Sequence, residues 1–247
     1  MRIALFVPCF VDQFAPQAAL AAARILQHLG HEVIVPPGQT CCGQPTFNTG
    51  YWPETRQVAR HFLQVFADHE TIVAPSGGCV GMVAKNYPWL FEGQPEEARA
   101  VEMAGRVHEF TSFLVDTLGV TDLGAQLQTT VTLHDSCHPL RELGTREQPR
   151  ALLRAVAGLT LAEMPQSDTC CGFGGAFSVK YPEISTAMAD EKLANALSTQ
   201  AEIITGVESS CLLHLQGRID RQRHPIKTMH LAELLARGMG LDLSPSL

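Results

Sequence analysis

The chain has 247 residues, of which 45% are hydrophobic and 17% are charged, and its formal net charge at pH 7 is −7. This length allows one large domain or two of about 120 residues, with enough apolar residues for a packed core. The acidic balance and the lack of a basic run argue against nucleic-acid binding, and no apolar segment reaches the length of a transmembrane helix.

The first half of the chain alternates short apolar runs with longer segments of helical periodicity. Val58, Phe62 and Phe66 repeat at helical spacing, whereas the apolar runs are short and end near Pro or Gly. The expected elements are a strand at 3–7, a helix at 17–29, a strand at 33–35, a helix around 58–66 and a strand at 71–74. Strands that alternate with helices predict a parallel sheet with right-handed crossovers.

The second half repeats this order. The expected elements are a strand at 131–133, a helix at 149–156 that closes at Gly158, a strand at 161–164, a helix at 184–197 and a strand at 202–205. Each half also ends with a histidine, His108 or His230, followed by an apolar helix. We therefore predict an α/β protein of two pseudo-twofold-related domains with parallel sheets, spanning residues 1–122 and 123–247.

Eight cysteines fall into two quartets with matching spacing. The first quartet is Cys9, Cys41, Cys42 and Cys79, and the second is Cys137, Cys170, Cys171 and Cys211. Corresponding cysteines lie 128, 129, 129 and 132 residues apart, which indicates a duplicated unit. Gly43 and Gly172 follow the two adjacent pairs and supply the backbone freedom that lets neighbouring sulfurs reach one centre from a loop.

The cysteines come just after strand candidates, at the edge where ligands gather in parallel sheets. The apolar run after Met1 is interrupted by Pro8 and Asp12 and has no cleavage site, so we expect a cytoplasmic chain whose cysteines stay reduced. Four thiolates in one pocket need a compensating cation. Zinc, an iron–sulfur cluster and thiol chemistry are the alternatives, and the absence of closely spaced cysteine pairs favours a cluster over zinc.

The repeated pattern Cys-x₃₁₋₃₂-Cys-Cys-Gly-x₃₅₋₃₈-Cys resembles the cysteine-rich CCG domain. This domain occurs in heterodisulfide reductase, in the iron–sulfur subunit of glycolate oxidase, and in lactate utilisation protein A. The strings HDSCHPLRELG at 134–144 and CCGFGGAFSVK at 170–180 are most similar to the lactate utilisation A branch. The resemblance covers essentially the whole chain, and implies that each quartet binds an iron–sulfur cluster of the [4Fe-4S] type.

The same resemblance implies a role in oxidation of L-lactate to pyruvate, by electron transfer through an oxidoreductase subunit that is active only with its partners. These partners are a ferredoxin-like iron–sulfur subunit of the B type and a C-type subunit. No residue is evident as a catalytic base, so the catalytic residues stay unassigned. The alternatives are a glycolate oxidase iron–sulfur subunit, a heterodisulfide or thiol reductase, and a zinc-stabilised binding module without redox function.

The chain departs from the family pattern at one position in each copy. The full motif ends in Cys-x-x-Cys, but the last position is Met82 in the first copy and His214 in the second. This loss counts against the non-cubane cluster of heterodisulfide reductase, whereas four cysteines suffice for an ordinary four-iron cluster. His214 is a candidate substitute ligand. His138 and Arg141 are expected to support the cluster from beside the ligands, by hydrogen bonding or charge.

Overall fold

The structure is a computed structural model that describes residues 1–244. It contains two four-stranded parallel sheets, one from each half of the chain, with strand orders β2-β1-β3-β4 and β6-β5-β7-β8. The strands are β1 (Arg2–Leu5), β2 (Glu32–Ile34), β3 (Ile72–Ala74), β4 (Val107–Glu109), β5 (Gln126–Leu133), β6 (Ala157–Leu161), β7 (Ile203–Gly206) and β8 (Lys227–His230). The equivalent strand orders confirm the predicted α/β class and the duplication.

Helices cover both faces of each sheet. Those of the first half are α1 (Cys9–Phe14), α2 (Pro16–His28), α3 (Gln44–Asn48), α4 (Trp52–Val65), α5 (Gly77–Gly81), α6 (Tyr87–Leu90), α7 (Glu97–Ala104) and α8 (Phe110–Ser112), with π-helical turns at Met82–Asn86 and Phe113–Thr117. Those of the second half are a π-helical turn at Pro139–Leu143, α9 (Glu147–Arg154), α10 (Ala176–Lys180), α11 (Pro182–Leu197), α12 (Ser209–Gln222) and α13 (Leu231–Gly238). Within residues 1–244, none of these helices has both the length and the apolar character to cross a bilayer.

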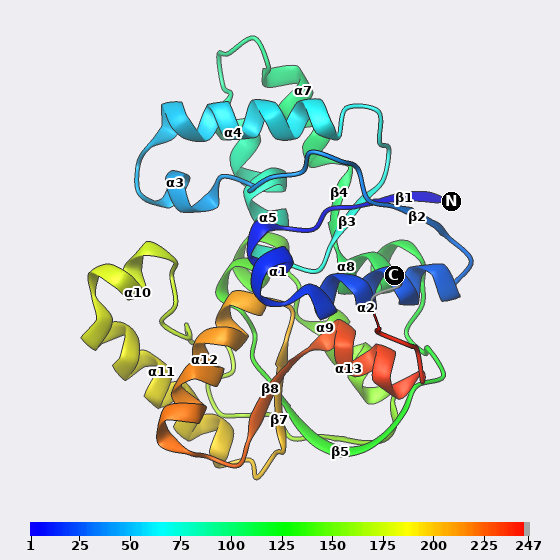
Figure 1. The fold of residues 1–247 in the computed structure, drawn as a ribbon, viewed down its shortest axis with the longest axis vertical. Coiled ribbons are helices and arrows are strands. Elements are labelled where there is room, and N and C mark those ends of the chain that lie inside the picture. The colour runs from blue at the N-terminus through cyan, green and yellow to red at the C-terminus, as the bar shows by residue number, and fades with distance from the viewer. Residues whose placement is uncertain (245–247) are drawn as a thin grey trace.

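The two halves share a central hydrophobic core. Alternate residues of β1 point to opposite faces, so that Ile3 and Leu5 enter the central core while Ala4 packs into an outer core with α4. The central core also contains buried side chains of α2 and α13, which lie side by side between the sheets (Figure 1). The alanines of α2 allow this close approach, and the shared core holds the halves in one fixed arrangement.

Most predicted elements match the structure to within a few residues, but the strand at 161–164 is wrong. The strand there is β6, which begins four residues earlier, at Ala157. Gly158 is not the end of a helix, as the sequence predicts, but lies inside β6 with φ of +84°. The pairing with β5 is irregular at this point, where the register shifts between Gln126 and Thr129. The glycine therefore marks a strand irregularity, a common use of glycine in sheets.

The carboxyl ends of the two sheets face each other. Helix α5, which follows β3, packs on the π-helical turn at Pro139–Leu143, which follows β5. A Cβ atom on Gly77 would lie 2.4 Å from Cβ of Pro139, so only glycine fits at this contact. This packing brings the loops after the strands of both halves to one place.

Candidate metal centres

Both cysteine quartets line a single cavity of about 500 Å³ between the two halves. We call Cys9, Cys41, Cys42 and Cys79 the first nest, and Cys137, Cys170, Cys171 and Cys211 the second nest. In each nest the thiols come from the loops or helix starts after three parallel strands, and all eight are free. Cavities at this edge are where α/β sheets bind ligands.

The thiols of the first nest share protons around Cys41. The pKa of Cys41 is lowered to about 3, because Cys42 and Cys9 donate hydrogen bonds to its thiolate. The backbone N–H of Gly43 donates to the same Sγ over 3.3 Å, from a residue with φ of +88°. These contacts, together with burial, raise the pKa values of Cys9 and Cys42. The nest therefore resists full ionisation unless a cation is present.

The second nest repeats this arrangement around Cys170. The pKa of Cys170 is lowered to about 2, because Cys137 and Cys171 donate hydrogen bonds to its thiolate. The N–H of Gly172, again at φ of +88°, donates to Cys170 Sγ over 3.4 Å. The donated bonds and burial raise the pKa values of Cys137 and Cys171. In both nests, the glycine after the cysteine pair thus donates a backbone hydrogen bond to the first sulfur of that pair.

His138 and Arg141 lie beside Cys137. His138 Nδ1 is 3.6 Å from Cys137 Sγ, and its Nε2 is 4.0 Å from a carboxylate oxygen of Glu142. The positive charge of Arg141 acts against the rise in the pKa of Cys137. Both residues therefore reach this sulfur, one by contact and the other by charge.

His214 and Met82, at the positions of the fifth family cysteine, have other surroundings. His214 Nε2 lies 3.3 Å from Ser185 Oγ, and its ring centroid is 5.8 Å from that of Phe173. Met82 is fully buried in the outer core of the first half. The structure thus gives His214 a hydroxyl partner and gives Met82 a packing role.

His134 is a residue whose position near the sulfurs was not expected from the sequence. One of its ring nitrogens and the sulfurs of Cys171 and Cys211 all lie within 4.8 Å of one another. The pKa of Cys211 is lowered well below its usual value, chiefly because Cys171 donates a hydrogen bond to it, and His134 adds to the effect. Aligning the two copies by their cysteines places His134 opposite Phe6, and this difference in polarity is visible in the sequence. Only the folded chain shows that His134 lies near the sulfurs.

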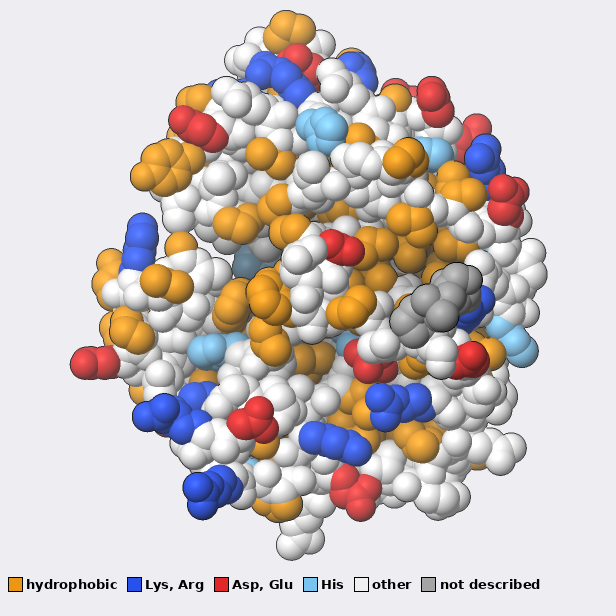
Figure 2. All heavy atoms as spheres, viewed as in Figure 1, with side chains coloured by type: hydrophobic (Ala, Val, Ile, Leu, Met, Phe, Trp, Pro, Cys, Tyr) orange, Lys and Arg blue, Asp and Glu red, His pale blue; other side chains and the backbone are white. Residues whose placement is uncertain are grey.

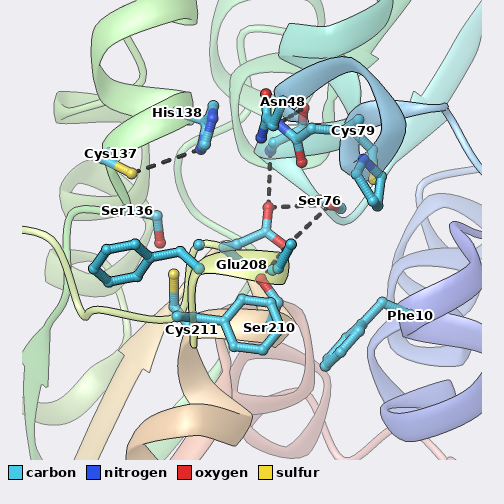
Figure 3. A pocket seen from close by; sticks show the side chains of 18 of the residues that line it. Phe10, Asn48, Ser76, Cys79, Ser136, Cys137, His138, Glu208, Ser210 and Cys211 are labelled. Atoms are coloured by element: carbon cyan, nitrogen blue, oxygen red, sulfur yellow. Dashed lines mark hydrogen bonds between the residues drawn. The ribbon is translucent and has the colours of Figure 1, made fainter. Parts of the chain in front are cut away.

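Glu208 was also not expected at the site, and it joins the two halves at the cavity. Its carboxylate accepts hydrogen bonds from the Gly78 N–H at 2.8 Å and from the Ser76 and Ser210 hydroxyls at 3.1 and 3.2 Å. Burial raises its pKa, and the charge of Cys211 adds to this rise. Figure 3 shows the carboxylate between Cys79 of the first nest and Cys211 of the second. One side chain of the second half thus holds the loop that carries a thiol of the first.

The cavity opens between α3 and α10. Asn48 and Thr49 line it on one side, and Phe177, Lys180 and Tyr181 line it on the other. Figure 2 shows the surface hollowed between these helices, with hydrophobic side chains across the middle of this face. The mouth of the cavity therefore carries both polar and aromatic side chains.

Known proteins share the sequence pattern of this chain. The family model described as a cysteine-rich domain (CCG) matches residues 3–84 and 131–216. Lactate utilization protein A of Exiguobacterium sp. is 46% identical over 241 residues, covering 96% of this chain and 98% of the relative. Lactate utilization protein A of Bacillus subtilis is 44% identical over 236 residues, covering 95% of this chain and 99% of the relative.

A solved structure shares the fold. The crystal structure of a hypothetical protein from Helicobacter pylori superposes with a TM-score of 0.59 over 98% of this chain and 49% of that one, at 10% sequence identity. Each segment matched by the family model contains one complete nest. The chain therefore belongs to the lactate utilization protein A family, within the cysteine-rich CCG-domain proteins.

Proposed function

We propose that this chain is the iron–sulfur subunit of a system that oxidises L-lactate to pyruvate. The observation that carries the proposal is the convergence of two four-thiol nests on one cavity. The substrate follows from relatives that are named for lactate utilization and match nearly the whole chain. Oxidation of lactate to pyruvate releases two electrons and two protons, and a [4Fe-4S] cluster, when bound, supplies one-electron transfer.

The donor chemistry of each nest fits a cluster. Four sulfurs lie together in each half, and their pKa values are driven apart because the thiols cannot all ionise side by side. A bound cationic centre would relieve this repulsion and release the remaining protons. Structural zinc sites are closed, whereas the nests here open to a cavity and Cys9 is exposed. Accessible thiols favour a redox centre over a structural ion.

The proposal gives each side chain a defined role. The first and second nests hold one four-iron cluster each, through all their thiolates. Gly43 and Gly172 direct backbone N–H groups at the ligand sulfurs. His138 and Arg141 support the second cluster at Cys137, by a contact with its sulfur and by positive charge. Glu208 fixes the distance between the two nests through its hydrogen bonds across the halves.

Metal content tests the cofactor. Protein purified without air is expected to be brown, to absorb near 400 nm and to contain about eight iron and eight sulfide per chain, four of each per cluster. Cys42→Ser and Cys171→Ser should each remove about half the iron. Met82→Leu, at the buried fifth-cysteine position, is the matched control and should keep it all. Colourless protein with stoichiometric zinc would overturn the assignment in favour of a non-redox module.

Growth tests the substrate. Deletion of the gene should abolish growth on L-lactate as sole carbon source and leave growth on glycolate intact. The wild-type gene should restore growth on lactate, whereas the Cys42→Ser gene should not. Loss of growth on glycolate alone would instead identify a glycolate oxidase subunit.

We also propose that the chain works with a ferredoxin-like iron–sulfur subunit of the B type and with a C-type subunit. The sequence contains no GxGxxG dinucleotide fingerprint that would indicate a nicotinamide acceptor in this chain, which supports transfer of the electrons to or from another protein. Anaerobic purification through a tag on this chain should recover both subunits, together with lactate oxidation in the presence of an artificial electron acceptor. Lactate oxidation by the isolated chain would contradict this division of labour.

A further inference from the structure

The two nests differ in the polarity of the residues around them. Phe6 and His134 occupy the same place in the two sheets, since the Phe6 N–H donates to Val73 O at 2.9 Å and the His134 N–H donates to Thr205 O at 2.8 Å. Val73 and Thr205 are themselves equivalent, each lying on the third strand of its half. The comparison of the two halves therefore places an imidazole where the first half has a phenyl ring.

The two rings have different neighbours. The Phe6 ring packs edge-on against Phe62 and Phe66, with centroids 4.9 and 5.6 Å away, in the outer core. The His134 imidazole instead shares a region within 4.8 Å with the sulfurs of Cys171 and Cys211. His134 is therefore aimed at the second nest.

The imidazole is buried without a nitrogen or oxygen partner. His134 is 1% exposed, and among residues 1–244 the polar groups near its ring are the sulfurs of Cys171 and Cys211, of which Cys211 has its pKa lowered by the ring. Leaving a buried polar group unpaired costs about 1–3 kcal/mol. A group at the second nest that accepts a hydrogen bond would remove this cost.

Buried hydroxyl groups show the same difference in polarity between the two halves. Four hydroxyl groups in the second half are buried and have no nitrogen or oxygen partner among the described residues, and the residues at the equivalent positions of the first half are all apolar or glycine. The hydroxyls belong to Thr132, Ser136, Thr205 and Ser209, and the equivalent residues are Ala4, Pro8, Val73 and Gly77. Ser136 lines the cavity directly and, like His134, acts to lower the pKa of Cys211. His134 and Ser136 thus give the second nest two polar side chains at positions where the first half has Phe6 and Pro8.

From this asymmetry we infer that His134 donates a hydrogen bond to a sulfur of the second centre, and that this centre is reduced more easily than the first. The inference rests on the proposed function, because it requires a cluster in each nest. Reduction adds one electron, whose negative charge is spread over the sulfurs, and an N–H donor stabilises that charge. Electrons that enter the chain therefore collect at the second centre.

Reduction potentials test the inference. In the wild-type protein, a redox titration followed by electron paramagnetic resonance should resolve two potentials, and the higher one belongs to the second centre. His134→Phe, which copies the first half, should make the reduction equilibrium of the second centre about tenfold less favourable. This corresponds to a potential lower by about 59 mV for one electron. His134→Gln, which keeps an N–H donor, should retain most of it. Phe6→Leu is the matched control and should move neither potential.

A spectroscopic measurement keeps the test valid if His134→Phe does not fold. Protein grown with ¹⁵N-histidine should give a nitrogen coupling to the reduced second centre in pulsed paramagnetic resonance. His134→Gln should lose the nitrogen coupling that belongs to His134, whereas His138→Gln, which removes the contact at Cys137, should leave that coupling in place. Iron-free protein would refute the proposed function itself. Two intact clusters with unchanged potentials and no coupling to His134 would refute only the inference.

Discussion

Glu109 provides a test of how burial controls stability in this fold. It ends β4 and is 1% exposed, and one carboxylate oxygen caps α8 by accepting the N–H groups of Thr111 and Ser112 at 2.9 and 3.0 Å. The other oxygen has no partner in the described chain. Burial raises the pKa of Glu109 from 4.5 to about 7, although the capping bonds act in the opposite direction. The folded protein therefore holds this proton more tightly than the unfolded chain does.

The sign of the pH dependence follows from this raised pKa. Below about pH 4.5 both states are protonated and the full stability is present. As the pH rises through 7, the unfolded chain has already lost its proton, and the free energy of unfolding falls by about 3 kcal/mol. Glu109→Gln resembles the protonated form and cannot ionise. It should match the wild type near pH 4.5 and exceed it by about 3 kcal/mol at pH 8.

Denaturant unfolding at a series of pH values measures this difference, because contributions from unchanged groups cancel between the two proteins. Glu54→Gln is the matched control, since Glu54 is likewise a glutamate at the start of a helix, in the first turn of α4, but is exposed. Its effect should vary little with pH. A difference between Glu109→Gln and the wild type that stays constant from pH 4.5 to 8 would refute the reasoning from burial.

Other perturbations test separate contacts. Asp135→Asn breaks the buried ion pair in which Arg150 donates two hydrogen bonds of 2.8 Å to Asp135, in the loop before Cys137. A denaturant titration should show a free energy of unfolding lower by about 3–5 kcal/mol. Gly172→Ala should prevent cluster assembly, measured as iron content, because its Cβ would lie 2.5 Å from a carbonyl oxygen of α11. The control Gly240→Ala is also at positive φ but in open space, and should lower the free energy of unfolding by only about 1 kcal/mol. The pKa of His230 is lowered by burial to about 4, so stability should fall between pH 6.5 and 4, and His230→Asn should flatten that fall in thermal melts.

Patterns within each half are sufficient to predict most of the fold. The short apolar runs and the helical repeat of Val58, Phe62 and Phe66 predict alternating strands and helices, and the cysteine register predicts the duplication. The structure agrees with both. The prediction fails at β6, because Gly158 can end a helix or occupy an irregular position in a strand, and only the pairing with β5 decides between them.

The two sets of four sulfurs could be identified from the chain alone, because their spacing reflects strand–helix–strand units that place loops at one edge of a sheet. Folding then brings both sets to one cavity, turns His134 to the second set and lets Glu208 reach the loop of the first. These contacts depend on how the two sheets pack through α2 and α13. Residues such as Gly78 and Glu208 are far apart along the chain, and no local periodicity encodes the distance between them in the folded protein.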